Sequence, residues 1–108
     1  MRDDLRRLLG EVAARRSTVT YGEISVLVSG GRLSPRSAAL GQLLGDVCRI
    51  EDAERGVMLG SVVVRADTGM PGDGYFTHAA ELGRDVDARR EFWSREVSRV
   101  WDVYESRA

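Results

Sequence analysis

Lysine is absent from this 108-residue chain, and cysteine and histidine each occur once. A single cysteine excludes a disulfide within the chain and is compatible with a reducing compartment. One Cys and one His cannot provide any of the usual zinc-ligand spacings, so we expect no metal site and no cofactor. The sixteen basic residues are therefore all arginines, and seventeen acidic residues bring the net charge to −1. This charge provides no strong overall attraction to nucleic acid or to a membrane surface.

Long apolar runs, a signal peptide and lipidation signals are also missing from the sequence. We therefore expect a soluble, cytoplasmic protein with no membrane partner. The length lies near the commonest size of a single domain and suffices to close one hydrophobic core. Apolar residues make up 43% of the chain and charged residues 31%, which is typical of a globular protein. We expect one domain over residues 1–108.

The first third of the chain predicts two helices joined by an extended segment. Apolar residues recur every three or four positions over residues 3–16, which indicates one buried helix face. Residues 18–20 are β-branched and predict extended backbone. Thr20 and Glu23 have the spacing of a capping box, T-x-x-E, which predicts a helix over residues 21–28. This second helix is rich in apolar residues, so we expect it to be largely buried, with Gly30 and Gly31 ending it.

The stretch SPRSAALGQLLGD, residues 34–46, predicts the longer partner of that helix. Ser34 is a suitable N-cap, and Pro35 suits the first helical position because its missing N–H costs nothing there. An apolar stripe at helical spacing predicts the buried face, comprising Ala39, Leu40, Leu43, Leu44, Val47 and Cys48. Arg36, Ser37 and Gln42 fall off this stripe. A helix-turn-helix would present these polar side chains to a DNA groove, although any surface helix has a similar pattern.

The second half of the chain predicts a small hairpin and more helix. Residues 57–65 read as a strand, DTGMPGDG at 67–74 as a turn, and residues 75–76 as a short return strand. Thr77 is a candidate cap for a short helix through Leu82, and a last helix is expected over residues 86–105 with its aromatic residues in the core. The predicted core contains Ile24, Leu40, Leu43, Leu44, Val62, Val64, Trp93 and Trp101. The fold class is therefore α+β, mostly helical: a helix-turn-helix, a small β-hairpin and a long C-terminal helix.

With these elements in order, the chain resembles the winged-helix domain of the alkylguanine-DNA alkyltransferases and the alkyltransferase-like proteins. TYGEIS (Thr20–Ser25) is similar to the family's TYGEIA motif, and AALGQLL (Ala38–Leu44) looks like its recognition helix. Residues 61–75 stand in the place of the P-C-H-R-V motif and the glycine-rich segment, and they end in Gly74-Tyr75. The resemblance covers roughly residues 18–76. It implies a winged-helix-like core there, with a helical extension over about 77–106.

The sequence departs from this family at its reactive residues. No Cys-His-Arg is present, because the corresponding strand reads GSVVVR (Gly60–Arg65). The family's DNA-inserting arginine falls on Ala38, and Arg36 is the nearest substitute. Among the DNA-contacting residues, only the motif tyrosine carries over, as Tyr21. Cys48 lies on the apolar stripe of a helix, where we expect it to be structural and unreactive.

The expected function is non-enzymatic binding of nucleic acid, most simply DNA, by this winged helix. Candidate contacts are Tyr21, Arg32, Arg36, Ser37 and Gln42, with Arg65 on the wing. Residues 17–50 carry three arginines against Glu23 and Asp46, so the half with the helix-turn-helix has a mild positive excess. The alternative is a protein-interaction module or homodimerising adaptor that uses the long helix or the aromatic C-terminal helix. Near-neutral charge favours this second hypothesis, because DNA-binding domains usually carry a distinct basic patch. A third alternative is an enzyme that uses residues 69–75 as a substrate loop with Asp67, Asp73 or His78, but no catalytic motif supports it.

Overall fold

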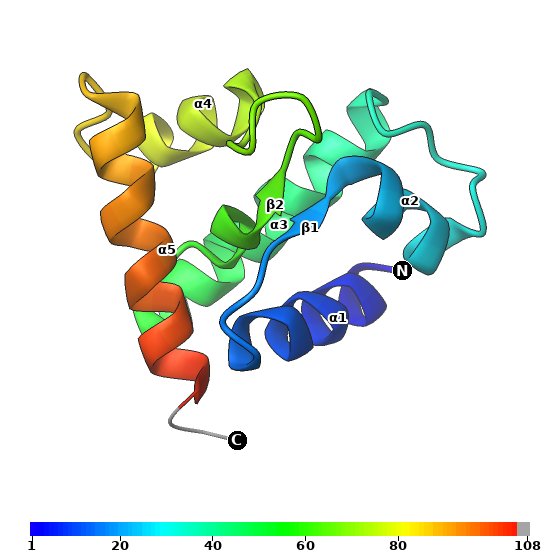
Figure 1. Ribbon diagram of the computed structural model, residues 1–108, viewed down its shortest axis with the longest axis horizontal. Helices are drawn as coiled ribbons and strands as arrows, with labels where there is room; N and C mark the ends of the chain where they lie inside the picture. Colours follow the sequence, from blue (N-terminus) through cyan, green and yellow to red (C-terminus); the bar gives the residue numbers. More distant parts are fainter. Residues whose placement is uncertain (106–108) are drawn as a thin grey trace.

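The computed structural model describes residues 1–105, and 67% of these residues are helical. In chain order the elements are α1 (Arg2–Ala14), β1 (Val19–Thr20), α2 (Tyr21–Ser29), α3 (Ala38–Arg55), the 3-10 helix η1 (Leu59–Val62), β2 (Val63–Val64), α4 (Asp73–Glu81) and α5 (Arg89–Glu105). Figure 1 shows the two short strands at the centre, surrounded by the helices. The expectation of a mostly helical protein with a small sheet is confirmed.

The small sheet is parallel, so the predicted β-hairpin is wrong. β1 pairs with β2 in the register Val19–Val63 and Thr20–Val64. Residues 59–62 form η1 instead of continuing the strand, and all residues from Val57 to Val64 are buried. Tyr75 and Phe76, which were expected in a return strand, lie in α4. Residues 57–64 are mostly apolar and are buried throughout, so their sequence shows no alternation of exposed and buried positions. Such a run does not distinguish a strand from a short buried helix, which explains the wrong prediction.

The long helix begins later and ends later than expected. Its N-cap is Ser37, whose Oγ accepts a hydrogen bond from the Leu40 N–H at 3.2 Å, rather than Ser34. Ser34 lies in a turn in which its own Oγ accepts from the Arg36 N–H at 3.2 Å. The helix then continues through the charged residues 50–55 to Gly56, which ends it in the left-handed conformation at φ 71°.

Several other predicted boundaries need smaller corrections. α1 covers Arg2–Ala14, and the capping box of α2 forms as expected, with Thr20 and Glu23 exchanging side-chain to backbone hydrogen bonds. α4 starts at Asp73, so Thr77 lies inside the helix and does not cap it. α5 starts at Arg89 rather than at residue 86. The last residue of the predicted extension, 106, lies outside the described residues.

The core consists of two adjoining clusters. The larger joins α1, α3, η1, the strands and α5, and the smaller contains Cys48, Met58, Tyr75, Phe76, Ala79 and Phe92. The predicted core is confirmed: Ile24, Leu40, Leu44, Val62 and Val64 are buried, and Leu43, Trp93 and Trp101 are partly buried against the larger cluster. Helix α2 is less buried than expected, because Val26 and Leu27 are 61% and 60% exposed. Ala39 on α3 is also exposed. No helix within residues 1–105 combines the length and apolar character needed to cross a membrane.

Candidate functional site

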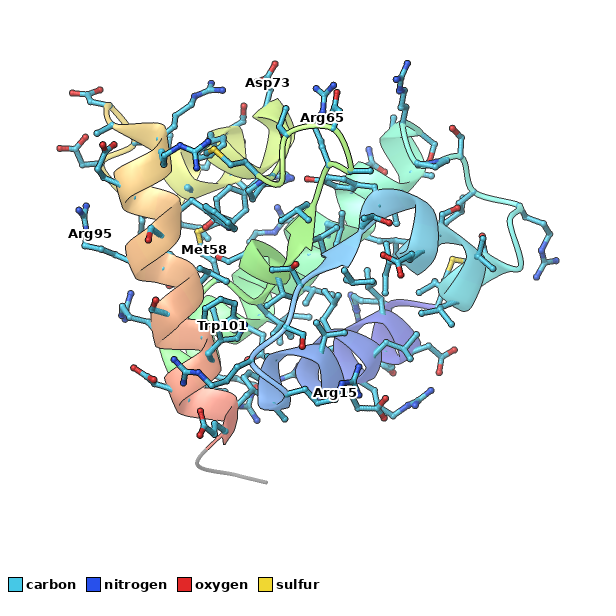
Figure 2. All side chains as sticks on the ribbon, viewed as in Figure 1. Arg15, Met58, Arg65, Asp73, Arg95 and Trp101 are labelled. Atoms are coloured by element: carbon cyan, nitrogen blue, oxygen red, sulfur yellow. The ribbon has the colours of Figure 1, made fainter. Side chains whose placement is uncertain are left out.

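A cavity of about 980 Å³ opens where α2, α3 and α4 begin. It lies between these helix starts and the segment that follows β2. Four of the six site residues expected from the sequence line it, and they come from different parts of the chain: Tyr21, Arg36, Ser37 and Arg65. Figure 2 shows Arg65 and Asp73, another lining residue, along the same edge of the molecule. The fold therefore brings most of the predicted site together.

Arg32 and Gln42 do not line this cavity. Arg32 follows α2 in the loop, and its Nε donates to the Ser29 carbonyl oxygen at 3.1 Å. Gln42 is exposed on α3, outside the cavity lining. The two residues therefore belong to a surface beside the cavity.

Tyr21 is fixed by the start of α2. The capping box places it as the first residue of the helix. Its phenolic oxygen accepts a hydrogen bond from the Gly72 N–H at 3.0 Å, which ties α2 to the segment before α4. Burial raises the pKa of Tyr21, and the bond from Gly72 partly offsets that rise. Tyr21 is therefore a neutral side chain at neutral pH, held in the wall of the cavity.

Arg65 is oriented by a closed turn. Its N–H donates to the Met70 carbonyl oxygen at 2.8 Å, and its own carbonyl accepts from the Gly69 N–H at 2.9 Å. Gly69 has φ 71°, a conformation that glycine adopts without strain. The guanidinium of Arg65 forms a bidentate pair with Asp67, at 3.0 and 2.8 Å. Hydrogen bonding from Arg65 lowers the pKa of the exposed Asp67 carboxyl. The turn predicted at 67–74 is thus present up to Gly72, but it leads into a helix.

Arg36 and Ser37 stand at the start of α3. The Ser37 N–H donates to the Ser34 carbonyl oxygen at 3.0 Å, which closes the turn before the helix. This turn leaves the Arg36 side chain exposed at the edge of the cavity. Within residues 1–105 Arg36 makes no ion pair, in contrast to Arg65. Of the two arginines that line the cavity, Arg36 is therefore the one available to an anionic partner.

The cavity lining also includes residues outside the predicted DNA contacts, among them Cys48, Tyr75 and His78. Cys48 is fully buried, and burial raises the pKa of its thiol to about 12. The Tyr75 hydroxyl forms a buried hydrogen bond of 2.6 Å with Ser61 Oγ, so this phenol already has a partner within the protein. Nδ1 of His78 is shielded from solvent and has no hydrogen-bond partner. Leu40, Leu44 and Cys48 are spaced four residues apart on α3, and this spacing was the sequence signal for a common face.

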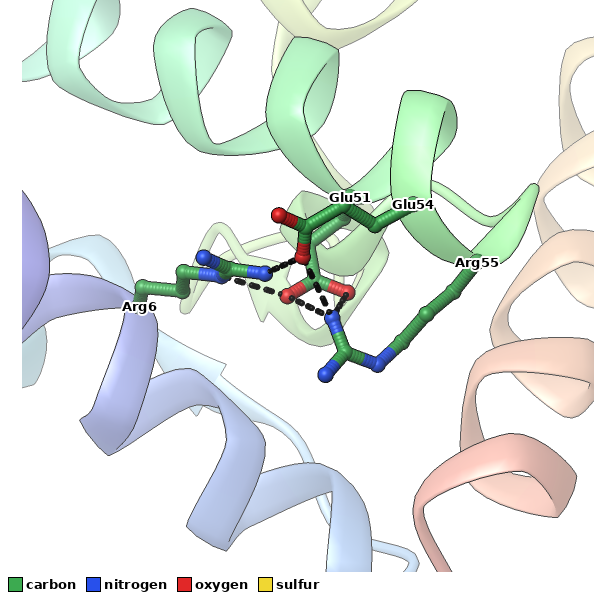
Figure 3. Close-up of polar contacts among 4 residues, drawn as sticks. All are labelled: Arg6, Glu51, Glu54 and Arg55. Atoms are coloured by element: carbon green, nitrogen blue, oxygen red, sulfur yellow. Dashed lines mark hydrogen bonds and ion pairs between the residues drawn. The ribbon is translucent and has the colours of Figure 1, made fainter.

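A second cavity of about 490 Å³ lies between α1, α3 and α5. It contains an ion-pair cluster, shown in Figure 3, formed by Arg6, Glu51, Glu54 and Arg55. Glu51 is fully buried and accepts from Arg6 Nε at 2.7 Å and from Arg55 at 3.1 Å. Each of these charges has an opposite partner, and the cluster joins α1 to α3. The Nε atom of Arg55 is shielded from solvent and has no hydrogen-bond partner.

The described part of the chain shows no candidate metal site. Within residues 1–105, no three His, Cys, Asp or Glu side chains gather where they could hold a metal ion. Comparisons with protein-family models, with curated proteins and with solved structures found no match to this chain.

Proposed function

We propose that this protein is a non-enzymatic nucleic-acid-binding protein, and that DNA is its partner. The observation that carries the proposal is the convergence of Tyr21, Arg36, Ser37 and Arg65 on one cavity. The sequence predicts these residues as DNA contacts, and they come from three separate segments of the chain, at positions 21, 36–37 and 65. A surface that combines exposed arginines with a cavity is suited to hold the phosphate backbone of a nucleic acid and to receive one of its bases.

Exposed arginines near the start of α3 support contact with a polyanion there. Arg36 is exposed without an ion pair at the edge of the cavity, and Arg32 is exposed on the loop that precedes it. Arg65 keeps a positive guanidinium, although Asp67 reduces its field. The net charge of −1 means that binding depends on these few contacts and not on overall attraction.

The resemblance to the alkyltransferase and alkyltransferase-like proteins supports the same choice of partner. Thr20–Ser25 matches the family's motif, and Tyr21 lies in the cavity as part of it. The cysteine of this chain is a buried, protonated thiol, which supports binding without alkyl transfer. The proposed protein would therefore bind DNA and leave it chemically unchanged.

The test is a titration of labelled duplex, single-stranded and alkylated DNA at low salt. Each arginine–phosphate contact contributes about 0.9 to the slope of log affinity against log salt on duplex DNA. We expect Arg36→Ala to weaken binding to all sequences and to reduce that slope by about one unit. Tyr21→Phe should weaken binding modestly, with a larger loss on alkylated DNA if a nucleotide is extruded from the stack.

Arg95→Ala is the matched control, because Arg95 is an exposed arginine that projects from α5 away from the cavity (Figure 2). This variant should keep the affinity and salt slope of the original protein. Absence of saturable binding to every DNA at micromolar protein would refute the proposal. Equal losses from Arg36→Ala and Arg95→Ala would refute the assignment of the surface.

The second candidate is a protein-interaction module, and a specific observation favours it. Val26 and Leu27 are adjacent on α2 and are among the few large apolar side chains that the described structure leaves exposed. The aromatic residues of α5, by contrast, are buried or packed against the core, so that helix is the weaker choice of contact surface. Sedimentation of the protein over a range of concentrations tests for a homodimer. Self-association that Leu27→Ser abolishes, without any DNA binding, would favour this second function.

A further inference from the structure

The cavity at the starts of α2, α3 and α4 has walls of two kinds. Its buried wall is mainly apolar and comprises Leu40, Leu44, Cys48, Gly60 and Tyr75. Its exposed rim is polar and contains Arg36, Arg65, Asp67 and Asp73. This is the usual composition of a small-molecule site, in which an apolar surface buries the body of the ligand and a few polar groups orient it. A volume of about 980 Å³ is sufficient for a ligand the size of a nucleotide.

The rim is suited to an anionic group. Arg36 is exposed there without an ion pair within residues 1–105. Both carboxylates of the rim have cationic partners: Asp67 binds Arg65, and Asp73 binds Arg89 at 2.8 Å. The backbone at Tyr21–Gly22 and at Asp73–Gly74 belongs to the first turns of α2 and α4, whose partial positive charge adds to that of Arg36. A phosphate at the rim would thus meet a positive side chain and amide groups, with the acidic residues already paired.

His78 forms a fixed part of the cavity wall. His78 lines the cavity, and its Nδ1 is shielded from solvent without a hydrogen bond. The imidazole packs against α3 so closely that a Cβ on Gly45 would lie 2.5 Å from its Cε1. The ring is therefore held in place. Because Nδ1 is shielded from solvent, a ligand in the cavity would meet His78 as part of a fixed wall and not through a hydrogen bond to Nδ1.

We propose that this cavity binds a free nucleoside monophosphate as a small-molecule ligand. The phosphate lies at the rim beside Arg36 and the first turns of α2 and α4. The base lies against the Leu40, Leu44 and Tyr75 wall, beside the fixed ring of His78. This inference goes beyond DNA binding, because the ligand needs no polynucleotide. The same chemistry could come from a nucleotide within DNA, and the two sources are separated by the experiment.

The experiment measures binding of the purine and pyrimidine nucleoside monophosphates to the full chain by isothermal titration calorimetry. Inorganic phosphate and the matching nucleosides are titrated in parallel. We expect saturable binding with one site per chain for at least one monophosphate, at least about tenfold tighter than for its nucleoside or for phosphate alone. Arg36→Ala should weaken binding of the monophosphate by roughly tenfold, because a charged hydrogen-bond partner of the phosphate is lost.

A variant that blocks the cavity provides the decisive comparison. Gly41 lines the cavity on α3, and a Cβ there would meet nothing within 4 Å, so Gly41→Leu extends into open space without a clash. Leucine is also a better helix former than glycine, so the variant should remain folded. Ala39→Leu is the matched control: it adds leucine to an exposed position of the same helix outside the cavity. We expect at least tenfold weaker monophosphate binding for Gly41→Leu and no change for Ala39→Leu.

The outcomes separate this inference from the proposed DNA function. Binding of DNA without binding of any monophosphate would overturn the inference and leave the DNA function in place. Binding of a monophosphate without DNA would support the inference and refute the DNA function. Equal affinity for the monophosphate in Gly41→Leu and in the original protein would also overturn the inference, since the ligand would then lie elsewhere. Circular dichroism of each variant verifies that it is folded.

Discussion

At the scale of single residues, the most constrained charge in the molecule is Glu51. Its carboxylate has no exposed surface, and it accepts hydrogen bonds from Arg6 on α1 and from Arg55 on α3 itself. Such a carboxylate is stable in the interior only because these cations compensate for the lost hydration. The neighbouring Glu54 contacts the same two arginines but is 52% exposed. The two glutamates therefore form a natural pair for measuring the effect of burial.

We expect Glu51→Gln to lower the free energy of unfolding by about 2 kcal/mol, because it replaces charged hydrogen bonds with weaker ones inside the protein. Glu54→Gln should change stability little, since water screens that pair. Urea unfolding followed by circular dichroism measures both. Equal effects of the two substitutions would show that burial does not distinguish these carboxylates.

Cys48 is expected to be unreactive in the native protein. Burial raises the pKa of its thiol to about 12, whereas an unfolded cysteine has a pKa near 8.5, so roughly a thousandfold less thiolate is present at neutral pH. Labelling with a thiol reagent should be correspondingly slower in the native state than in urea. The stability that this raised pKa contributes is complete below about pH 8.5 and is lost as the pH rises toward 12, because the unfolded thiol ionises first. Rapid labelling of native protein would contradict this.

At the scale of elements, the contact between η1 and α3 depends on a glycine. A Cβ on Gly60 would lie 2.7 Å from the Sγ atom of Cys48, closer than these atoms can pack. Gly60→Ala should therefore separate the two elements and cost roughly 1–3 kcal/mol. Combining it with Cys48→Ala should recover much of that loss, because the sulfur atom is removed. Gly74→Ala is the control, since a Cβ there meets nothing within 4 Å. Additive losses in the double variant would contradict this steric explanation.

The elements that the sequence predicted well are those with local signals. The capping box at Thr20 and Glu23 and the glycine that ends α2 each act within a few residues, so the chain itself carries the information. The β1–β2 pair joins positions 19 and 63, and nothing in either short segment specifies its partner. Asp73 begins α4 without a side-chain cap, so the helix at Tyr75 had no N-terminal signal. Serine at both 34 and 37 explains the shifted start of α3, because either residue could serve as its cap.

The residues of the candidate site also differ in whether a local sequence signal predicts them. Tyr21, Arg36, Ser37 and Arg65 were found because they lie in or beside recognisable motifs. His78 is suggested by the sequence only within the enzyme alternative, because a lone histidine on a helix carries no spacing signal. Its place in the cavity results from the packing of α4 against α3 at Gly45, a contact between distant parts of the chain.

At the scale of the whole molecule, Trp93 joins the two clusters of the core. It packs against both, and its Nε1 donates to the Ser61 carbonyl oxygen at 2.8 Å. We expect the original protein to unfold in one transition, with tryptophan fluorescence and circular dichroism giving the same midpoint. Trp93→Ala should lower the free energy of unfolding by about 3 kcal/mol. Trp93→Phe, which keeps the ring but loses the hydrogen bond, should lower it by about 1 kcal/mol. A midpoint unchanged by Trp93→Ala would refute this role.

The pairing of β1 with β2 has a consequence for the time course of folding. Val19 can meet Val63 only after the chain between them, which includes α2 and α3, has closed into a loop. Loop closure of this length costs entropy before the strand contacts repay it, whereas the helices need only local contacts. We therefore infer that helix formation precedes strand pairing. The cavity is lined partly by this loop and partly by the chain that follows β2, so we expect it to form after the strands have paired.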